Sequence, residues 1–176
     1  GLLAASAVLL AACSQPEEQS AMTGVEETAV VETAAVSYPD YEASVDSDRL
    51  INADDEPGQW MSNGRDYWEQ RFSPLSQVNT DTVSDLGLVW SADLDTSRGQ
   101  EATPVVVDGA LYVTTAWSMV KAYDATSGEL LWEFDPEVDR ARGVDACCDV
   151  VNRGVAAWDG KIFFGALDGR LIALDS

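Results

Sequence analysis

The sequence predicts an all-β fold made of repeated antiparallel units, because one pattern occurs twice along the chain. Residues 107–113 (VDGALYV) match residues 158–164 (WDGKIFF), and residues 120–124 (VKAYD) match residues 171–175 (LIALD). Both matches share an offset of 51 residues and need no gap. Each unit reads as a strand, an Asp-Gly hairpin turn, a second strand, another turn and a third strand.

The first unit continues through residues 125–133 as a further turn and a fourth strand. The corresponding part of the second unit would fall beyond Ser176, so we expect the chain to stop inside a repeat. Four short antiparallel strands that recur at roughly 40–50 residues are typical of β-propeller blades. The alternative is a β-sandwich in which the two matching stretches are similar only by chance. Because a propeller closes only with several blades, we expect unpaired blade faces and edges in this chain.

The region before the repeats is also patterned. Residues 59–75 are dense in aromatic side chains and arginine. Residues 79–86 offer capping side chains for a short helical turn, which Gly87 would end. Residues 88–94 then read as a strand. We therefore expect residues 49–176 to form the N-terminal part of an incomplete propeller.

The composition limits the partners that the chain could have. The 176 residues carry 31 acidic and 10 basic side chains, which gives a formal net charge of −21. This charge disfavours nucleic acid and anionic membrane surfaces, because the phosphate groups of both would repel it.

The N-terminal residues predict export and a lipid anchor. Residues 1–12 are an apolar run too short to span a bilayer, which we interpret as part of a lipoprotein signal peptide. The LAAC sequence that ends at Cys13 resembles the bacterial lipobox, so Cys13 is the expected lipidation site; an ordinary secretory signal is the alternative. Residues 13–48 are acidic, with almost no basic side chain, and predict a disordered tether. Acyl chains would then hold a periplasmic protein to a membrane.

Cys147 and Cys148 are adjacent, which is unusual. Neighbouring Cα atoms lie about 3.8 Å apart, below the usual disulfide span of roughly 4.4–6.8 Å. A bond between the two would close a small strained ring, and such strain tends to lie at functional sites. The ring would offer a flat apolar platform to a ligand. The alternatives are two reduced thiols or pairing elsewhere, although a lipidated Cys13 would leave these two to pair in an oxidising compartment. Zinc is disfavoured, since the chain has no histidine.

These motifs resemble one family. Residues 122–132 (AYDATSGELLW) resemble the tryptophan docking motif of the pyrroloquinoline quinone (PQQ)-dependent alcohol dehydrogenases. Residues 60–75, residues 99–104 and the stretch from Cys147 to Arg153 also look like that family. The resemblance covers about residues 49–176, and its most specific part is the cysteine pair followed by Arg153.

The resemblance implies an eight-bladed propeller that holds PQQ, with a calcium or lanthanide ion, in a central funnel. A disulfide between Cys147 and Cys148 would lie against one face of the quinone. Glu101 would bond polar groups of the cofactor, and Arg153 would pair with one of its carboxylates. The alternatives are a Glu101 that simply lies at the surface beside a turn, and an Arg153 that pairs with Asp149.

The function implied by the resemblance is oxidation of a primary alcohol to an aldehyde, with electrons passed to a cytochrome c. No residue of the chain matches the family's catalytic aspartate or remaining metal ligands, so neither role is assigned. One rival function is a non-enzymatic propeller scaffold of outer-membrane assembly, which shares the tryptophan motif but has no need of adjacent cysteines. Another is a quinoprotein sugar dehydrogenase; the membrane glucose enzymes of that group lack the cysteine pair.

Overall fold

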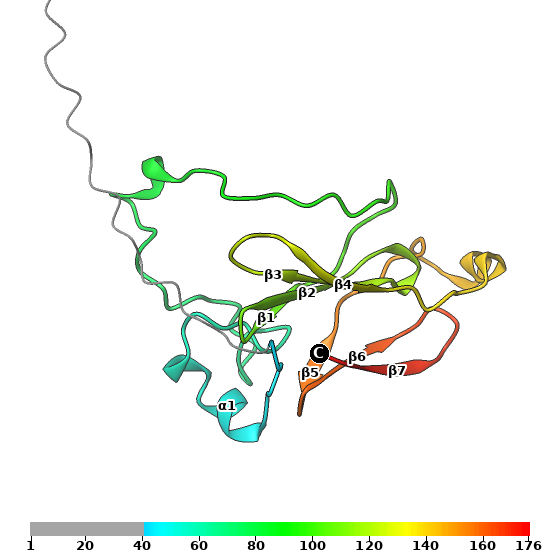
Figure 1. The fold of residues 1–176 in the computed structure, drawn as a ribbon, viewed down its shortest axis with the longest axis horizontal. Helices are drawn as coiled ribbons and strands as arrows, with labels where there is room; N and C mark the ends of the chain where they lie inside the picture. The colour runs from blue at the N-terminus through cyan, green and yellow to red at the C-terminus, as the bar shows by residue number, and fades with distance from the viewer. Residues whose placement is uncertain (1–40) are drawn as a thin grey trace, which may run out of the picture. The chain divides into compact units, whose positions relative to one another are not determined.

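The computed structural model describes residues 41–176, which form two antiparallel sheets preceded by an irregular region (Figure 1). The first sheet has the strand order β1-β2-β3-β4 and the second has the order β5-β6-β7. The first sheet consists of β1 (Val105–Val107), β2 (Ala110–Thr114), β3 (Val120–Asp124) and β4 (Leu130–Phe134). The second consists of β5 (Ala156–Trp158), β6 (Lys161–Gly165) and β7 (Leu171–Asp175). The helices are short: α1 (Ser47–Ile51) and 3₁₀ turns at Ala53–Asp55, Val83–Asp85, Ala116–Ser118 and Arg140–Asp145.

The strand positions confirm the repeat. The strands β5, β6 and β7 begin and end 51 residues after β1, β2 and β3, as the sequence offset predicts. The strand β4 confirms the expected fourth strand of the first unit. The meander order of both sheets is that of propeller blades rather than of a sandwich.

The Asp-Gly turns explain why each unit starts as a tight hairpin. Val107 pairs with Ala110 across the first turn, so only Asp108 and Gly109 form the loop. Their φ angles are 50° and 86°, both in the left-handed region. The turn at Asp159 has the same form, with φ angles of 47° and 73°. Two residues with positive φ make the turn whose twist matches that of antiparallel strands, and Asp-Gly is among the pairs that adopt it most easily.

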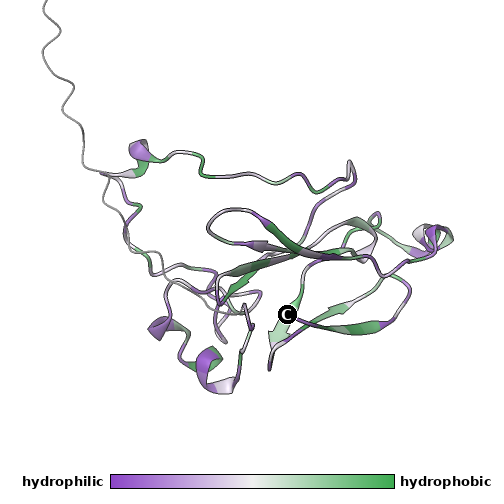
Figure 2. Cartoon of the chain, viewed as in Figure 1, coloured by the Kyte–Doolittle hydropathy of each residue, from purple (hydrophilic) through white to green (hydrophobic). Residues whose placement is uncertain are grey.

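The inward side chains of both sheets form one hydrophobic cluster, and Figure 2 shows the hydrophobic residues concentrated on the strands. Phe134 of β4 meets Phe164 of β6 edge-on, with ring centroids 6.1 Å apart, which joins the two sheets. Trp132, the last residue of the predicted docking motif, packs against Tyr112 at 5.8 Å. The fully buried members of this cluster are Ala43, Val45, Val105, Val107, Ala110, Tyr112, Val120, Ala122 and Ile162.

The sequence predicted that the tether ends and the propeller begins at residue 49. In the structure, packed residues begin before that position. Residues 41–49 form what we call the N-terminal strap, in which Ala43 and Val45 are fully buried. Two small apolar side chains among acidic neighbours gave too weak a signal to separate this segment from a tether. The predictions for the signal peptide, for Cys13 and for the tether as far as residue 40 lie outside the described residues.

The N-terminal strap contacts the Asp-Gly turns of both units. The Val45 carbonyl accepts a hydrogen bond of 2.9 Å from the Asp159 N–H. Arg49 donates to both carboxylate oxygens of Asp108, at 2.9 and 3.1 Å, and also to Glu56. The hydrogen bonds to Glu56, and then those to Asp108, raise the pKa of Arg49 further above its usual range. The strap therefore ties the two units together.

Of the two elements predicted before the repeats, one is confirmed and one is wrong. The 3₁₀ turn at Val83–Asp85 confirms the short helical turn. Residues 88–94 do not form a strand: Leu88 is 84% exposed, and no residue of 41–176 pairs with this segment in a ladder. Within this segment Trp90 stacks on Tyr123, with ring centroids 6.3 Å apart. A strand needs a hydrogen-bonding neighbour, which sequence propensity alone does not supply.

Within the described residues, no helix is long and apolar enough to cross a membrane.

Candidate cofactor-binding site

The segments 98–103 and 149–154 run side by side in the same direction. They occupy equivalent places in the two units, immediately before the first strand of each. Thr103 and Gly154 form a parallel bridge, in which the Thr103 N–H donates to the Arg153 carbonyl at 3.3 Å. These loops bring together residues that lie about 50 positions apart in the chain.

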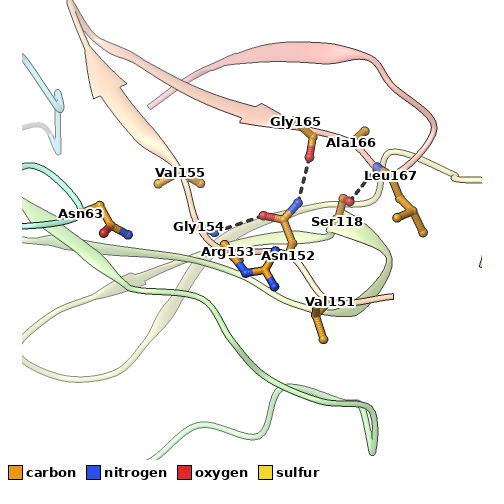
Figure 3. A pocket seen from close by; sticks show the side chains of 10 residues that line it. All are labelled: Asn63, Ser118, Val151, Asn152, Arg153, Gly154, Val155, Gly165, Ala166 and Leu167. Atoms are coloured by element: carbon orange, nitrogen blue, oxygen red, sulfur yellow. Dashed lines mark hydrogen bonds between the residues drawn. The ribbon is translucent and has the colours of Figure 1, made fainter. Parts of the chain in front are cut away.

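Gly154 and Asn152 fix the path of the second segment. Gly154 has a φ of 126°, and a Cβ at this position would lie 2.8 Å from the Thr103 carbonyl oxygen. The Asn152 side chain accepts from the Gly154 N–H at 3.1 Å and donates to the Gly165 carbonyl at 2.8 Å. Figure 3 shows Asn152 between these two partners. A glycine is thus required here by both conformation and space.

An open depression of about 410 Å³ lies beside this segment (Figure 3). Its lining combines a guanidinium, two amides and apolar side chains, from Asn63, Ser118, Val151, Asn152, Arg153, Gly154, Val155, Gly165, Ala166 and Leu167. Such a mixture suits a ligand that is partly apolar and partly anionic.

Glu101 and Arg153, both predicted as cofactor-binding residues, meet in the structure. Arg153 Nη2 lies 3.0 Å from Glu101 Oε2, and the two side chains are 71% and 43% exposed. The alternative partner of Arg153 is not used, because Asp149 pairs with Arg98 instead. The alternative expectation for Glu101 was a position at the surface beside a turn. Glu101 is indeed exposed, but it also pairs with Arg153.

Cys147 and Cys148 are exposed, and neither forms a disulfide within the described residues. The hydrogen bond with Cys147 is the main cause that raises the pKa of the Cys148 thiol. The charge of Arg153 lowers this pKa and that of Glu101 raises it, so both charges act on the same sulfur. Cys148 is thus close enough to Glu101 and Arg153 for both of their charges to affect its thiol.

Sequence reasoning missed the contribution of Trp117, which lies in the turn between β2 and β3. Its main-chain N–H donates to the Val150 carbonyl at 2.8 Å, and its ring lies under the guanidinium of Arg140 at 4.3 Å. The unusual φ of 65° at Trp117 leaves no trace in the residue type. The role of Asn152 was missed as well, although it lies within the stretch that drew attention.

Among residues 41–176, no three histidine, cysteine or carboxylate side chains cluster as metal ligands do. The sequence assigned no metal ligand and no catalytic base to this chain.

Two antiparallel meander sheets that repeat at an offset of 51 residues define the chain as part of a β-propeller. The family model described as "Glucose/ethanol/alcohol dehydrogenase, beta-propeller domain" matches residues 60–176, and the chain belongs to this PQQ family.

Individual relatives agree with the family. The quinohemoprotein alcohol dehydrogenase ADH-IIG of Pseudomonas putida is 58% identical over 137 residues, which are 78% of this chain and 19% of the relative. The 1-butanol dehydrogenase (cytochrome c) of Thauera butanivorans is 58% identical over 119 residues, or 68% of this chain and 17% of the relative. The chain thus spans about a fifth of the length of these relatives.

Solved structures give the same result. The structure of ADHIIG from Pseudomonas putida HK5 matches 77% of this chain and 20% of its own, at 57% identity and a TM-score of 0.75. A europium-containing methanol dehydrogenase matches 73% of this chain and 23% of its own, at 43% identity and a TM-score of 0.67.

Proposed function

We propose that this chain contributes to a PQQ-dependent enzyme that oxidises a primary alcohol to an aldehyde. The observation that supports this most is the Glu101–Arg153 pair beside Cys147 and Cys148. It occurs in a chain that shares 58% identity with a quinohemoprotein alcohol dehydrogenase. The rival functions, a scaffold propeller and a sugar dehydrogenase, lack such an observation.

The residues present fit PQQ, a flat tricarboxylate. Arg153 is 71% exposed and offers a planar fork of donors that matches a carboxylate. Glu101, already within 3.0 Å of Arg153, would accept hydrogen bonds from the cofactor and keep the guanidinium oriented. Two sulfurs add an apolar, polarisable surface for a ring. When bound, PQQ supplies an electrophilic quinone that accepts the hydride equivalent of the alcohol.

The state of the cysteine pair is part of the proposal. We expect a Cys147–Cys148 disulfide in the exported protein, because an oxidising compartment favours it and both thiols are exposed. Peptide mass spectrometry without reductant should then show the loss of two hydrogens within one peptide. Thiols that remain open to alkylation would contradict this expectation.

The surroundings of the enzyme are proposed from its relatives and its N-terminus. The name of one relative includes cytochrome c, which supports a cytochrome c as electron acceptor here. A europium-containing relative supports a lanthanide, with calcium as the alternative ion. The lipobox-like end at Cys13 supports a periplasmic, lipid-anchored protein. Detergent-phase partitioning that survives in a Cys13→Ser variant would contradict the anchor.

The experiment uses the full-length protein with PQQ and either calcium or a lanthanide. Dye-linked oxidation of short primary alcohols should depend on PQQ. Arg153→Ala should weaken PQQ binding at least about tenfold, because a carboxylate loses a charged donor worth roughly 1.5–3 kcal/mol. Arg142→Ala is the matched control, since Arg142 is an exposed arginine paired with Asp145 in the same loop. Tight PQQ binding without alcohol turnover would favour a sugar substrate, and neither binding nor turnover would favour a scaffold.

A further inference from the structure

Arg98 and Asp149 stand at equivalent positions of the two units, and they bind each other. Arg98 Nε donates to both carboxylate oxygens of Asp149, at 2.9 and 3.0 Å, and Arg98 Nη2 also contacts the carboxylate. These hydrogen bonds are the main cause that lowers the pKa of Asp149 to about 2. The pair therefore stays ionised at neutral pH and links the two parallel segments at their start.

The second ion pair between the same segments has the opposite order of charge. Arg98 faces Asp149, whereas further along Glu101 faces Arg153 at 3.0 Å. A slip of one segment in one direction would bring Arg98 toward Arg153, and a slip in the other direction would bring Glu101 toward Asp149. Like charges placed opposite one another are unfavourable. The two pairs together select one register of the two segments. Cys147 and Cys148 come directly before Asp149, the residue that Arg98 holds in this register.

Asp149 also carries a backbone constraint. Its φ is 67°, in the left-handed region that a residue other than glycine adopts only at a cost. The next residue, Val150, is 1% exposed, and its carbonyl accepts the hydrogen bond from Trp117. The guanidinium of Arg98 lies 6.0 Å from the Trp117 ring. The chain just after the cysteine pair is thus fastened by a side chain at Asp149 and by its main chain at Val150.

A contribution to folding stability does not explain the Arg98–Asp149 pair. The two side chains are 49% and 33% exposed, and exposed ion pairs contribute little to folding. We propose that Arg98 is a positioning residue: by holding Asp149, it keeps the sulfurs of Cys147 and Cys148 beside the Glu101–Arg153 pair. The identity of the ligand served by this placement rests on the proposed function.

The test compares Arg98→Gln, Asp149→Asn and Arg98→Lys in the full-length protein, with Arg142→Gln as control. Arg142 forms a similar exposed pair with Asp145, at 3.3 Å, in the turn that precedes the cysteines. Two quantities are measured: the Kd for PQQ, and the rate at which iodoacetamide modifies Cys147 and Cys148 after reduction. Thermal unfolding checks that each variant is folded.

We expect Arg98→Gln and Asp149→Asn to raise the Kd for PQQ about tenfold, at the lower end of what supporting shells contribute at metal sites. We also expect them to change the alkylation rates about threefold or more, since thiol reactivity follows the local environment. The control should leave both quantities unchanged. Arg98→Lys separates placement from charge, because it keeps the charge but loses the two-bond geometry. We expect it to behave like Arg98→Gln.

Wild-type values of both quantities in Arg98→Gln and Asp149→Asn would overturn the positioning role. So would a wild-type Arg98→Lys, since the effect would then be one of charge alone. If the unmodified protein binds no PQQ, the proposed function fails. The alkylation rates, which need no cofactor, still decide whether Arg98 places the cysteines.

Discussion

The two repeats share their strand register but not their environment. Val120 and Leu171 occupy equivalent positions at the start of the third strand, yet Val120 is fully buried and Leu171 is 78% exposed. The strand β3 lies between β2 and β4, whereas β7 is an edge strand within the described residues. The local sequence thus sets the hairpin, and the neighbouring elements set how much of it is buried.

The next position along the strand shows the same dependence. Lys121 is 3% exposed, and its ammonium lies 2.8 Å from Asp95 and 2.6 Å from Glu133. Burial tends to lower the pKa of this lysine, but the hydrogen bonds to the two carboxylates outweigh it and raise the pKa. The second unit has Ile172 at the equivalent position. A buried lysine is tolerated in the first unit because β4 and the segment before β1 each supply a carboxylate.

The largest expected effect is at Gly154, whose equivalent in the first unit is Thr103. Gly154→Ala should destabilise the protein by roughly 2–4 kcal/mol, from left-handed backbone strain and from contact with the Thr103 carbonyl. Urea unfolding followed by tryptophan fluorescence measures this change. Gly165→Ala is the control, because nothing lies within 4 Å of a Cβ there. Equal effects of both substitutions would contradict the close approach of the two segments.

A smaller effect is expected from the Asp-Gly turns. Arg49→Ala should cost about 1.5–3 kcal/mol, because Asp108 and Glu56 each lose a charged donor in a partly buried place. The equivalent turn aspartate, Asp159, has no side-chain hydrogen bond to residues 41–176, so Asp159→Asn should change stability by less than about 0.5 kcal/mol. Urea midpoints compare the two variants. Similar values would mean that the N-terminal strap holds both turns alike.

The smallest effect concerns pH. The pKa of Asp149 is lowered to about 2, first by the hydrogen bonds from Arg98. Because the folded pKa is depressed, the contribution of the pair is complete above the unfolded value of about 3.9 and is lost as the pH falls toward 2. NMR titration of the Asp149 carboxyl should give this low value, and Arg98→Gln should raise it. A wild-type pKa near 4 would show that the pair does not form in solution.

The sequence predicted the candidate site residues but not which of them pair with one another. Glu101, Cys147, Cys148 and Arg153 match a family pattern, and the structure pairs Glu101 with Arg153 while both charges act on the pKa of Cys148. Which acid pairs with which arginine depends on how two loops lie side by side, and the one pairing considered from the sequence, Arg153 with Asp149, does not form. The exposed segment 88–94 failed as a predicted strand for a related reason, since its pattern specifies a strand without specifying a neighbour.

The sequence by itself determined the repeat, the Asp-Gly turns and the order of the strands within each unit. These depend on interactions between residues that are close along the chain, so side-chain periodicity and turn chemistry record them. Only the tertiary structure decided the burial of the N-terminal strap, the role of Trp117 and the matched order of the Arg98–Asp149 and Glu101–Arg153 pairs. Each of these joins segments about 30 to 110 residues apart, and contacts over such separations are fixed by packing rather than by local preference.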